Sequence, residues 1–188
     1  MIHQVKFVTG NENKLREARE ILGMEIEAAD AGELPELQTI SVEEVIRHKA
    51  EEAYKILGAP LIVEDSGLVF TAWNGLPGAL VKWFEKSVGN EGLLKMLATE
   101  SDRRALAQCC IALHDGQSTR VVKGEVPGII SDSVRGSGGF GWDKIFMPEG
   151  HDRTFAEMSA EEKNSMSHRK IAFENLKRVI NASSGWNP

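Results

Sequence analysis

The feature that most constrains the fold of this chain is the order in which its apolar patterns change period along the sequence. A strand-like run at residues 5–9 is followed by residues at helical spacing, which stop at Gly23. Later, a long strand-like stretch at 105–116 ends in an Asp-Gly hairpin signal, and residues 118–126 should pair back with it. These patterns predict one α/β domain, residues 1–188, with a mixed sheet.

Capping signals predict where two further helices begin. Ser41 and Glu44 form the pattern S-V-E-E and open a helix that ends at Gly58, while Ser159 and Glu162 form S-A-E-E before the last helical stretch. The remaining expected elements are a short strand near 25–29, a short buried strand at 61–65, a turn at 74–78, helical material from 80 to 98 interrupted near Gly89, a glycine-dense loop at 135–143 and a loosely ordered tail at 183–188.

Composition narrows the possible ligands and the expected cellular compartment. With 188 residues, 41% of them hydrophobic, the chain can bury the core of one domain. Its net charge of −6 weighs against a nucleic-acid polymer as partner and suits a carboxylate site for Mg²⁺. No apolar run approaches a membrane span, and the N-terminus is too polar for a signal peptide. Cys109 and Cys110 should point to opposite faces of a strand and form no disulfide framework, so a reducing, cytoplasmic setting is expected.

Four segments carry residues suited to chemistry, and the first runs from Thr9 to Lys14. It joins the first strand to the first helix, where free backbone N–H groups and the helix dipole favour an anion. Asn11 adds a donor and Lys14 a cation. The P-loop spacing is absent, and a capped helix start with a surface lysine explains the segment equally well.

The second segment places Glu64, Asp65 and Ser66 at the end of an apolar strand. Buried acids are costly unless cations meet them, and strand ends are where open α/β sheets bind ligands. The two acids should face opposite sides of the sheet, so that one alone reaches a given metal. A strand that runs out into a solvated turn is the alternative, and Glu36 is a possible further acid.

The third segment, residues 136–143, matches G-x-G-x-x-G but lacks the strand, helix and distant acid of a dinucleotide site. We therefore reject a Rossmann interpretation. Phe140, Trp142 and Asp143 suit stacking on a base, although an ordinary glycine turn with packed aromatic residues fits too. The fourth segment, 163–169, puts His168 and Arg169 on different helix faces from Lys163 unless the helix breaks near Ser167, which could cap a restarted helix.

Taken together, these segments closely resemble the inosine triphosphate pyrophosphatase family. The motifs TGNENK, LPE, VEDSG, GLPG with KWF, GFGWD, TFAEM and EEKN with SHR occur in the family's order and span residues 9 to 169. The resemblance implies an elongated fold with a long twisted sheet flanked by helices, two lobes around a central cleft, and commonly a homodimer. It also implies Mg²⁺-dependent hydrolysis of ITP, dITP and XTP to the monophosphate and pyrophosphate.

The resemblance also implies roles for individual residues. Lys14, Glu36 and Asp65 are expected to be catalytic, with Glu36 and Asp65 handling Mg²⁺ and the attacking water. Asp65 is either a metal ligand or a general base. The expected substrate-binding residues are Thr9, Asn11, Lys14, Lys49, Ser66, Lys82, Phe140, Gly141, Trp142, Asp143, Lys163, Ser167, His168 and Arg169. Of these, Phe140 and Trp142 resemble a base-stacking pair and the lysines at 14, 49 and 82 resemble phosphate contacts.

Base choice is expected to depend on Arg169. A buried arginine facing the 6-oxo group of hypoxanthine would be left unpaired by adenine, and Arg169→Ala should then reduce ITP turnover far more than folding. Lys144 stands where many relatives have proline, and the segment around Lys49 is less diagnostic than the others. The alternatives are a pyrophosphatase for dTTP, UTP or modified pyrimidines, and a nucleotide-binding regulator without catalysis.

Overall fold

The computed structural model describes residues 5–23 and 26–182, so the expected tail at 183–188 lies outside the described residues. The elements follow in the order β1 (Lys6–Val8), α1 (Glu12–Leu22), β2 (Ala28–Ala29), α2 (Val42–Leu57), β3 (Leu61–Phe70), η2 (Thr71–Trp73), β4 (Pro77–Gly78), α3 (Val81–Met96), β5 (Arg104–His114), β6 (Thr119–Ile130), η3 (Gly141–Lys144), β7 (Phe146–Pro148), η4 (Phe155–Glu157), α4 (Ala160–Met166) and α5 (His168–Ala182). No helix in these ranges is both long and apolar enough to cross a membrane.

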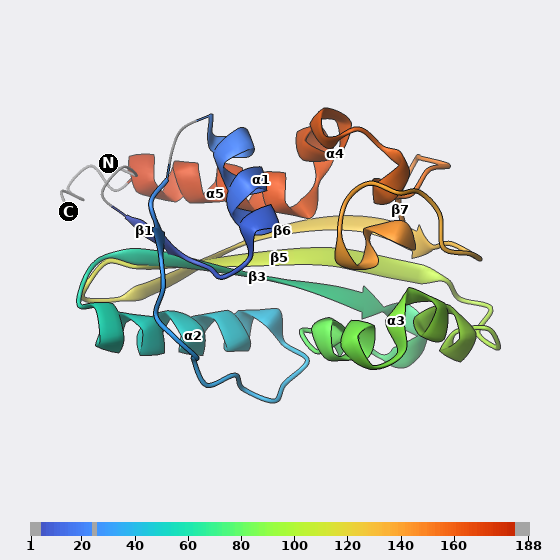
Figure 1. The fold of residues 1–188 in the computed structure, drawn as a ribbon, viewed down its shortest axis with the longest axis horizontal. Helices are drawn as coiled ribbons and strands as arrows, with labels where there is room; N and C mark the ends of the chain where they lie inside the picture. The colour runs from blue at the N-terminus through green and yellow to red at the C-terminus, as the bar shows by residue number, and fades with distance from the viewer. Residues whose placement is uncertain (1–4, 24–25, 183–188) are drawn as a thin grey trace.

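The strands form one open mixed sheet, which confirms the predicted class (Figure 1). Its order is β2-β1-β3-β5-β6-β7, and β4 pairs with β3 beside this path. Strand β1 runs parallel to β2 and β3, whereas the other pairings are antiparallel. The predicted hairpin is the β5–β6 pair, in which His114 lies opposite Thr119. Its strands are the longest of the sheet and give the molecule its elongated shape (Figure 1).

Helices cover both faces of this sheet, with α1, α4 and α5 on one side and α2 and α3 on the other (Figure 1). Successive side chains of a strand point to opposite faces, so each central strand contributes to two cores. Ile62 and Cys109 pack in the core under α1 and α5, and Leu61 and Cys110 pack under α2. Both cysteines are buried and face opposite sides, as predicted.

A separate core at the far end of the sheet gives the chain its second lobe. Leu68 and Phe70 of β3 pack there with Phe146 and Phe155 from the C-terminal half of the chain. Strand β3 thus begins in the first lobe and ends in the second. The polar segment 64–67 lies between the cores of the first lobe and the core of the second, and Asp65 and Ser66 within it are only partly buried.

Strand β3 is longer than the sequence pattern predicts, and this corrects the expected boundary at residue 65. Glu64 and Asp65 remain in the ladder opposite Ile111 and Cys110, and the pairing continues to Phe70. The acids do not end the strand because lysine and arginine side chains from other elements compensate their charges. The solvated-turn interpretation of this segment is therefore wrong.

The helix boundaries follow the predicted signals with one qualification. Ser41 and Ser159 each accept a hydrogen bond from the backbone N–H three residues later, at 3.3 and 3.1 Å. Neither capping box is reciprocal, because Glu44 accepts from the hydroxyl of Thr39 instead and the other glutamate pairs with an arginine. The interruption of α3 at Gly89 is confirmed by its backbone angles, φ 67° and ψ −177°.

Candidate active site

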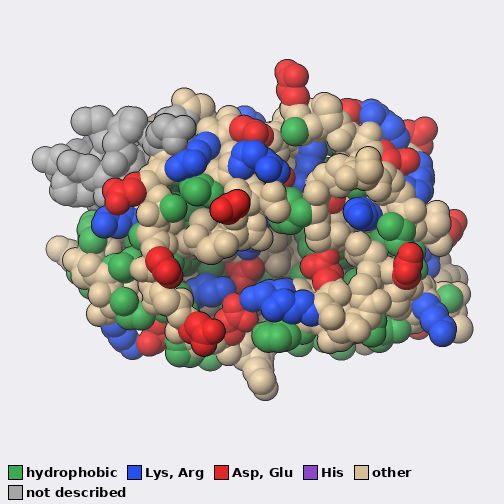
Figure 2. Space-filling view, in the orientation of Figure 1, with side chains coloured by type: hydrophobic (Ala, Val, Ile, Leu, Met, Phe, Trp, Pro, Cys, Tyr) green, Lys and Arg blue, Asp and Glu red, His purple; other side chains and the backbone are tan. Residues whose placement is uncertain are grey.

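A cleft with a volume of about 740 Å³ crosses β3 between the cores of the first lobe and the core of the second. Figure 2 shows a hollow in the middle of this face with acidic and basic side chains around it. The predicted site residues that line the cleft are Thr9, Asn11, Lys14, Glu36, Lys49, Asp65, Ser66, Lys82, Phe140, Gly141, Trp142, Asp143, His168 and Arg169. Lys163 and Ser167 are not among its lining residues. Both are buried and support the wall from behind.

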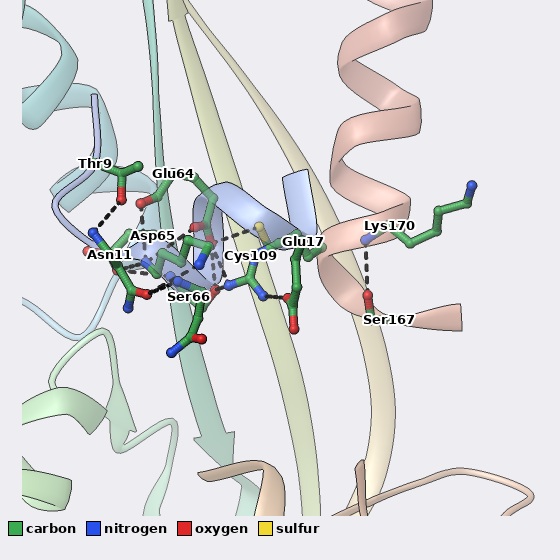
Figure 3. Close-up of polar contacts among 12 residues, drawn as sticks. Thr9, Asn11, Glu17, Glu64, Asp65, Ser66, Cys109, Ser167 and Lys170 are labelled. Atoms are coloured by element: carbon green, nitrogen blue, oxygen red, sulfur yellow. Dashed lines mark hydrogen bonds and ion pairs between the residues drawn. The ribbon is translucent and has the colours of Figure 1, made fainter. Parts of the chain in front are cut away.

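The turn between β1 and α1 is held by its own side chains. The side-chain oxygen of Asn11 caps α1 by accepting from the backbone N–H groups of Asn13 and Lys14, at 3.0 and 3.2 Å. Thr9 accepts from the backbone N–H of Asn11 at 3.1 Å (Figure 3). Capping uses the oxygen of Asn11, so its amide nitrogen is the group left to meet a ligand. The capped helix start and the anion site are therefore compatible.

Lys14 joins the two acids that point to opposite faces of β3. Its Nζ lies 3.2 Å from Oδ1 of Asp65 and 3.3 Å from Oε2 of Glu64. Both contacts are possible because β1 ends at Val8, opposite Val63, and Lys14 enters the space beyond that end. Burial alone would raise the pKa of Asp65, but Lys14 and Lys49 outweigh it and hold that pKa below its usual value. Asp65 is therefore ionised at neutral pH.

The second predicted acid, Glu36, is linked to Asp65 through a shared lysine. Lys49 Nζ lies 3.0 Å from Oε1 of Glu36 and 3.5 Å from Oδ2 of Asp65, and Lys82 Nζ lies 3.5 Å from Oε1 of Glu36. Burial would raise the pKa of Glu36, but the hydrogen bond from Lys49 and the charges of both lysines lower it. With Glu64, this end of the cleft thus holds three carboxylates and three lysines.

The carboxylates do not form a complete metal cage. Within residues 5–23 and 26–182, no group of three or more His, Cys, Asp or Glu side chains is arranged to hold a metal ion. Mg²⁺ is commonly held by one or two carboxylates together with water and substrate phosphates. Asp65 and Glu36 fit that pattern, in which the ion enters with its phosphate ligand.

At the other end of the cleft, a short loop carries Phe140 and Asp143. Asp143 Oδ2 accepts from the backbone N–H of Phe140 at 2.8 Å and lies 2.7 Å from Lys163 Nζ. Burial raises the pKa of Asp143, and the lysine opposes this effect only in part. The Lys163 Nζ is also 4.8 Å from the centre of the Phe140 ring. The acid therefore fixes the loop while Phe140 remains partly exposed.

Trp142 departs from the expected stacking pair. It is 7% exposed and packs in the core of the second lobe against Phe146 and His168, with ring centroids 5.7 and 5.1 Å away. Phe140 therefore offers the more accessible ring, and Trp142 mainly supports the cleft wall. The segment after the loop is less extended than its sequence suggests, because η3 precedes the three-residue strand β7.

A buried network of opposite charges lies behind the cleft and includes a residue that the sequence patterns did not single out. Arg169 pairs with Glu17 and with Glu64, the latter at 3.2 Å, and its Nη2 donates to Ser66 Oγ at 3.1 Å. Glu17 also accepts from Lys163 at 2.9 Å. A signal for Glu17 existed, because this acid lies on the apolar face of α1 beside Ala18 and Ile21.

These contacts give Arg169 a structural role, and its expected recognition of the base stays a prediction. Its two terminal nitrogens pair with carboxylates, whereas its Nε is buried and has no hydrogen-bond partner within the described residues. Burial opposes the charged form, but Glu64 and Glu17 raise its pKa further above the usual arginine value. Arg169 is thus a charge of the core as well as a residue of the cleft wall.

His168 presents a different case. It is 2% exposed, and within the described residues neither of its ring nitrogens has a hydrogen-bond partner. Burial, together with the charges of Arg169 and Lys163, lowers its pKa well below the usual value, so the ring is neutral. Of the two alternatives for this segment, the structure shows the helix break, because Ser167 separates α4 from α5 and accepts from the Lys170 N–H at 3.2 Å. That break places His168 and Arg169 on the cleft.

Comparisons with known proteins agree with this geometry. The model of the Ham1 family matches residues 5–179. An inosine triphosphate pyrophosphatase of Scheffersomyces stipitis is 45% identical over 94% of this chain and 97% of its own, and a dITP/XTP pyrophosphatase of Methanopyrus kandleri is 43% identical over 91% and 93%. The Staphylococcus aureus Ham1 protein superposes with a TM-score of 0.83 at 31% identity, covering 95% of this chain and all of that one. The chain belongs to the Ham1 family.

Proposed function

We propose that this protein hydrolyses the non-standard purine nucleoside triphosphates ITP, dITP and XTP to the monophosphate and pyrophosphate, with Mg²⁺ as cofactor. The observation that carries the proposal is a single cleft with two chemically different ends. Three lysines and three ionised carboxylates meet at one end. An accessible aromatic ring lies at the other end, together with a neutral histidine whose nitrogens have no hydrogen-bond partner among the described residues. A nucleoside triphosphate has the same division into charged and aromatic parts.

At the phosphate end, Lys14, Lys49 and Lys82 bind the triphosphate oxygens and replace their present carboxylate partners with substrate. The N-terminus of α1 adds backbone donors. Asp65 and Glu36 would hold Mg²⁺, which would supply neutralisation of phosphate charge and a more nucleophilic water. Water attacks the α-phosphorus, the bond from that phosphorus to the bridging oxygen breaks, and pyrophosphate leaves with its electron pair.

The electrostatics of Asp65 favour one of its two possible roles. A general base works best when its pKa lies near the operating pH, whereas the neighbouring lysines hold the pKa of Asp65 low. An acid that stays ionised suits metal binding and orientation of the attacking water. We therefore assign Asp65 primarily to the metal, with the proton of the water passing to solvent or phosphate.

At the base end, Phe140 stacks on the purine and His168 supplies the hydrogen bonds. A neutral imidazole can donate one hydrogen bond and accept another, which suits the oxo and N–H groups of hypoxanthine. Burial leaves these nitrogens without water, so the base stabilises the site by pairing them. Arg169 and Lys163 fix the wall behind the ring.

The test is pyrophosphate release from ITP, XTP, dITP, GTP, ATP and dTTP with and without Mg²⁺. We expect Mg²⁺-dependent release from the first three, with the monophosphate as the second product. A preference for dTTP would favour the pyrimidine enzymes, and binding without release would favour a regulator. Release of orthophosphate instead would place the cleaved bond elsewhere.

We also propose that the protein acts as a homodimer in the cytoplasm, where it removes these nucleotides before polymerases use them. Ile40 and Leu76 support the dimer, because they are 43% and 39% exposed although large and apolar. Their segments touch, with the Ile40 Cδ1 3.4 Å from the Cβ position of Gly75. Sedimentation equilibrium of the wild type and of Ile40→Glu tests this: a monomeric wild type would contradict it.

A further inference from the structure

Glu85, on α3, lines the cleft but has no part in the chemistry described above. It is half-buried, and its carboxyl group rests against the loop that carries Phe140. A Cβ atom on Gly141 would lie 3.0 Å from Oε1 of Glu85. The absence of that atom, at a residue with φ of 62°, is what lets the carboxyl group approach the loop backbone.

The surroundings of Glu85 do not neutralise its charge. Its helix packs against η3, which carries Asp143 and Lys144, and against β4, which consists of Pro77 and Gly78 and has no ionisable side chain. On α3 itself, Lys82 and Lys86 lie against the ring of Trp83, with Nζ atoms 5.7 and 5.1 Å from its centre. Burial, and secondarily the charge of Asp143, raise the pKa of Glu85 to about 7.

With a pKa of about 7, Glu85 is present in both its protonated and its ionised form near neutral pH, and a nucleotide base bound in the cleft meets either form. The protonated form both donates and accepts hydrogen bonds, whereas the ionised form only accepts and carries a negative charge. Hypoxanthine and xanthine differ in their hydrogen-bond acceptors and in their acidity, and both properties affect how a base interacts with a protonated or an ionised carboxyl group. Xanthine has a second oxo acceptor at position 2 and is the more acidic base, so that near neutral pH much of it is an anion.

We propose that Glu85 is a specificity-determining residue whose ionised carboxylate disfavours xanthine relative to hypoxanthine. The proposal rests on the proposed function, since it assumes that Phe140 and its loop receive the base. Like charges close together in a partly buried site destabilise one another, and a second acceptor facing a carboxylate loses its hydrogen bond. Protonated Glu85 removes both penalties.

The experiment compares XTP with ITP across pH in wild type and in Glu85→Gln, which keeps the shape but cannot ionise. Between about pH 6 and about pH 8, the XTP-to-ITP ratio of kcat/KM should fall in both proteins. The fall in the wild type should be roughly ten times as large as the fall in the variant. The change of this ratio with pH in Glu85→Gln measures the effect of xanthine ionisation alone. The additional change in the wild type measures the effect of Glu85 ionisation. Glu91→Gln, at an exposed site on the same helix, should behave as wild type.

The outcomes separate this inference from the proposed function. If wild type hydrolyses ITP but its selectivity changes with pH as in Glu85→Gln, the inference is wrong and the function stands. If wild type hydrolyses no purine triphosphate, the proposed function fails. In that case, calorimetry measures the affinities of XMP and IMP for the same three proteins across pH. If Glu85 disfavours xanthine, the XMP-to-IMP affinity ratio should fall more with rising pH in the wild type than in Glu85→Gln.

Discussion

Single residues in this cleft act through charges that are buried in opposite pairs. Arg169 is 2% exposed and serves two carboxylates, Glu17 and Glu64, that are 5% exposed each. Taking one partner from a buried ion pair leaves an uncompensated charge in a poorly solvated place. We therefore expect Arg169→Ala to lower the free energy of unfolding by about 3–5 kcal/mol, as well as ITP turnover. Urea unfolding followed by tryptophan fluorescence measures it.

The matched control is Arg153→Ala. Arg153 pairs with Glu162 at the surface, where both side chains are substantially exposed. Exposed ion pairs contribute about 0–1 kcal/mol, so this substitution should leave the unfolding midpoint nearly unchanged. Equal stability losses in the two variants would show that burial of the pair is not what matters.

Glu36 allows a separate test of the metal. Replacing it with glutamine removes one of two carboxylates while retaining a hydrogen-bonding group for Lys49. We expect the Mg²⁺ concentration for half-maximal ITP hydrolysis to rise at least about tenfold, because a neutral amide is a poor ligand for a hard cation. Glu33→Gln, at another exposed acid of the cleft, is the control and should not change it. An unchanged Mg²⁺ dependence in Glu36→Gln would remove Glu36 from the metal site.

The sequence was a good guide to which side chains line the cleft. It was a poorer guide to the contacts that these side chains make with one another. Lys14, Asp65 and Lys49 come together as expected, since cations and acids at strand ends had few other partners to meet. The burial of Trp142 and the pairing of Arg169 with Glu17 could not be predicted. Both depend on contacts across more than a hundred residues or between lobes, which no local period encodes.

At the level of elements, the position of α5 depends on a glycine in the sheet. A Cβ atom on Gly124 of β6 would lie 2.0 Å from the carbonyl oxygen of His168 and 2.3 Å from the backbone nitrogen of Ala172. Gly124→Ala must therefore push the start of α5 away from the sheet, with an overpacking cost of about 1–3 kcal/mol. Because that start carries His168 and Arg169, the KM for ITP should rise together with the loss of stability.

Thermal unfolding and ITP kinetics on the same preparation check this. Gly10→Ala is the stability control, since a Cβ atom there meets nothing within 4 Å. If Gly124→Ala unfolded like the wild type, α5 would have room to shift without cost. A normal KM in a destabilised variant would separate helix packing from the base end of the cleft.

The elements themselves were largely predictable because capping residues, glycines and changes of period are local. The helix break at Ser167 and the kink at Gly89 follow from such signals. The extent of β3 does not, because adjacent acids usually end a strand. Here Lys14 from α1 and Lys49 from α2 compensate Asp65, and these lysines belong to segments that meet it only in the folded chain.

In the whole molecule, the cleft exists because β3 connects two cores while its middle belongs to neither. The first lobe supplies Lys14, Lys49 and Glu36, and the second supplies Lys82 on α3 and the loop with Phe140. Glu36, Glu64 and Asp65 each face a cation from another element, whereas Glu85 does not. The charges of the active site and the junction between the lobes are therefore stabilised by the same contacts.

This coupling predicts how stability depends on pH. The pKa of Glu64 is lowered because Arg169 and Lys14 outweigh the effect of burial, and the pKa of Asp65 is lowered by Lys14 and Lys49 in the same way. An acid with a lowered folded pKa contributes stability above its unfolded pKa, about 4, and loses it as pH falls toward the folded value. The free energy of unfolding should thus decrease from about pH 5 downward.

Lys14→Met tests whether the lowered pKa values of Glu64 and Asp65 cause the loss of stability in acid. Without that cation, the pKa values of Glu64 and Asp65 move toward their unfolded values, so the variant should be less stable at neutral pH but lose less on acidification. Lys55→Met is the control, because Lys55 pairs with Glu52 on the exposed side of α2. Urea titrations of the three proteins between about pH 3 and about pH 7 measure the slopes. Equal slopes in the wild type and Lys14→Met would mean that acids elsewhere in the molecule control its acid unfolding, and that the junction between the lobes is stabilised by apolar packing alone.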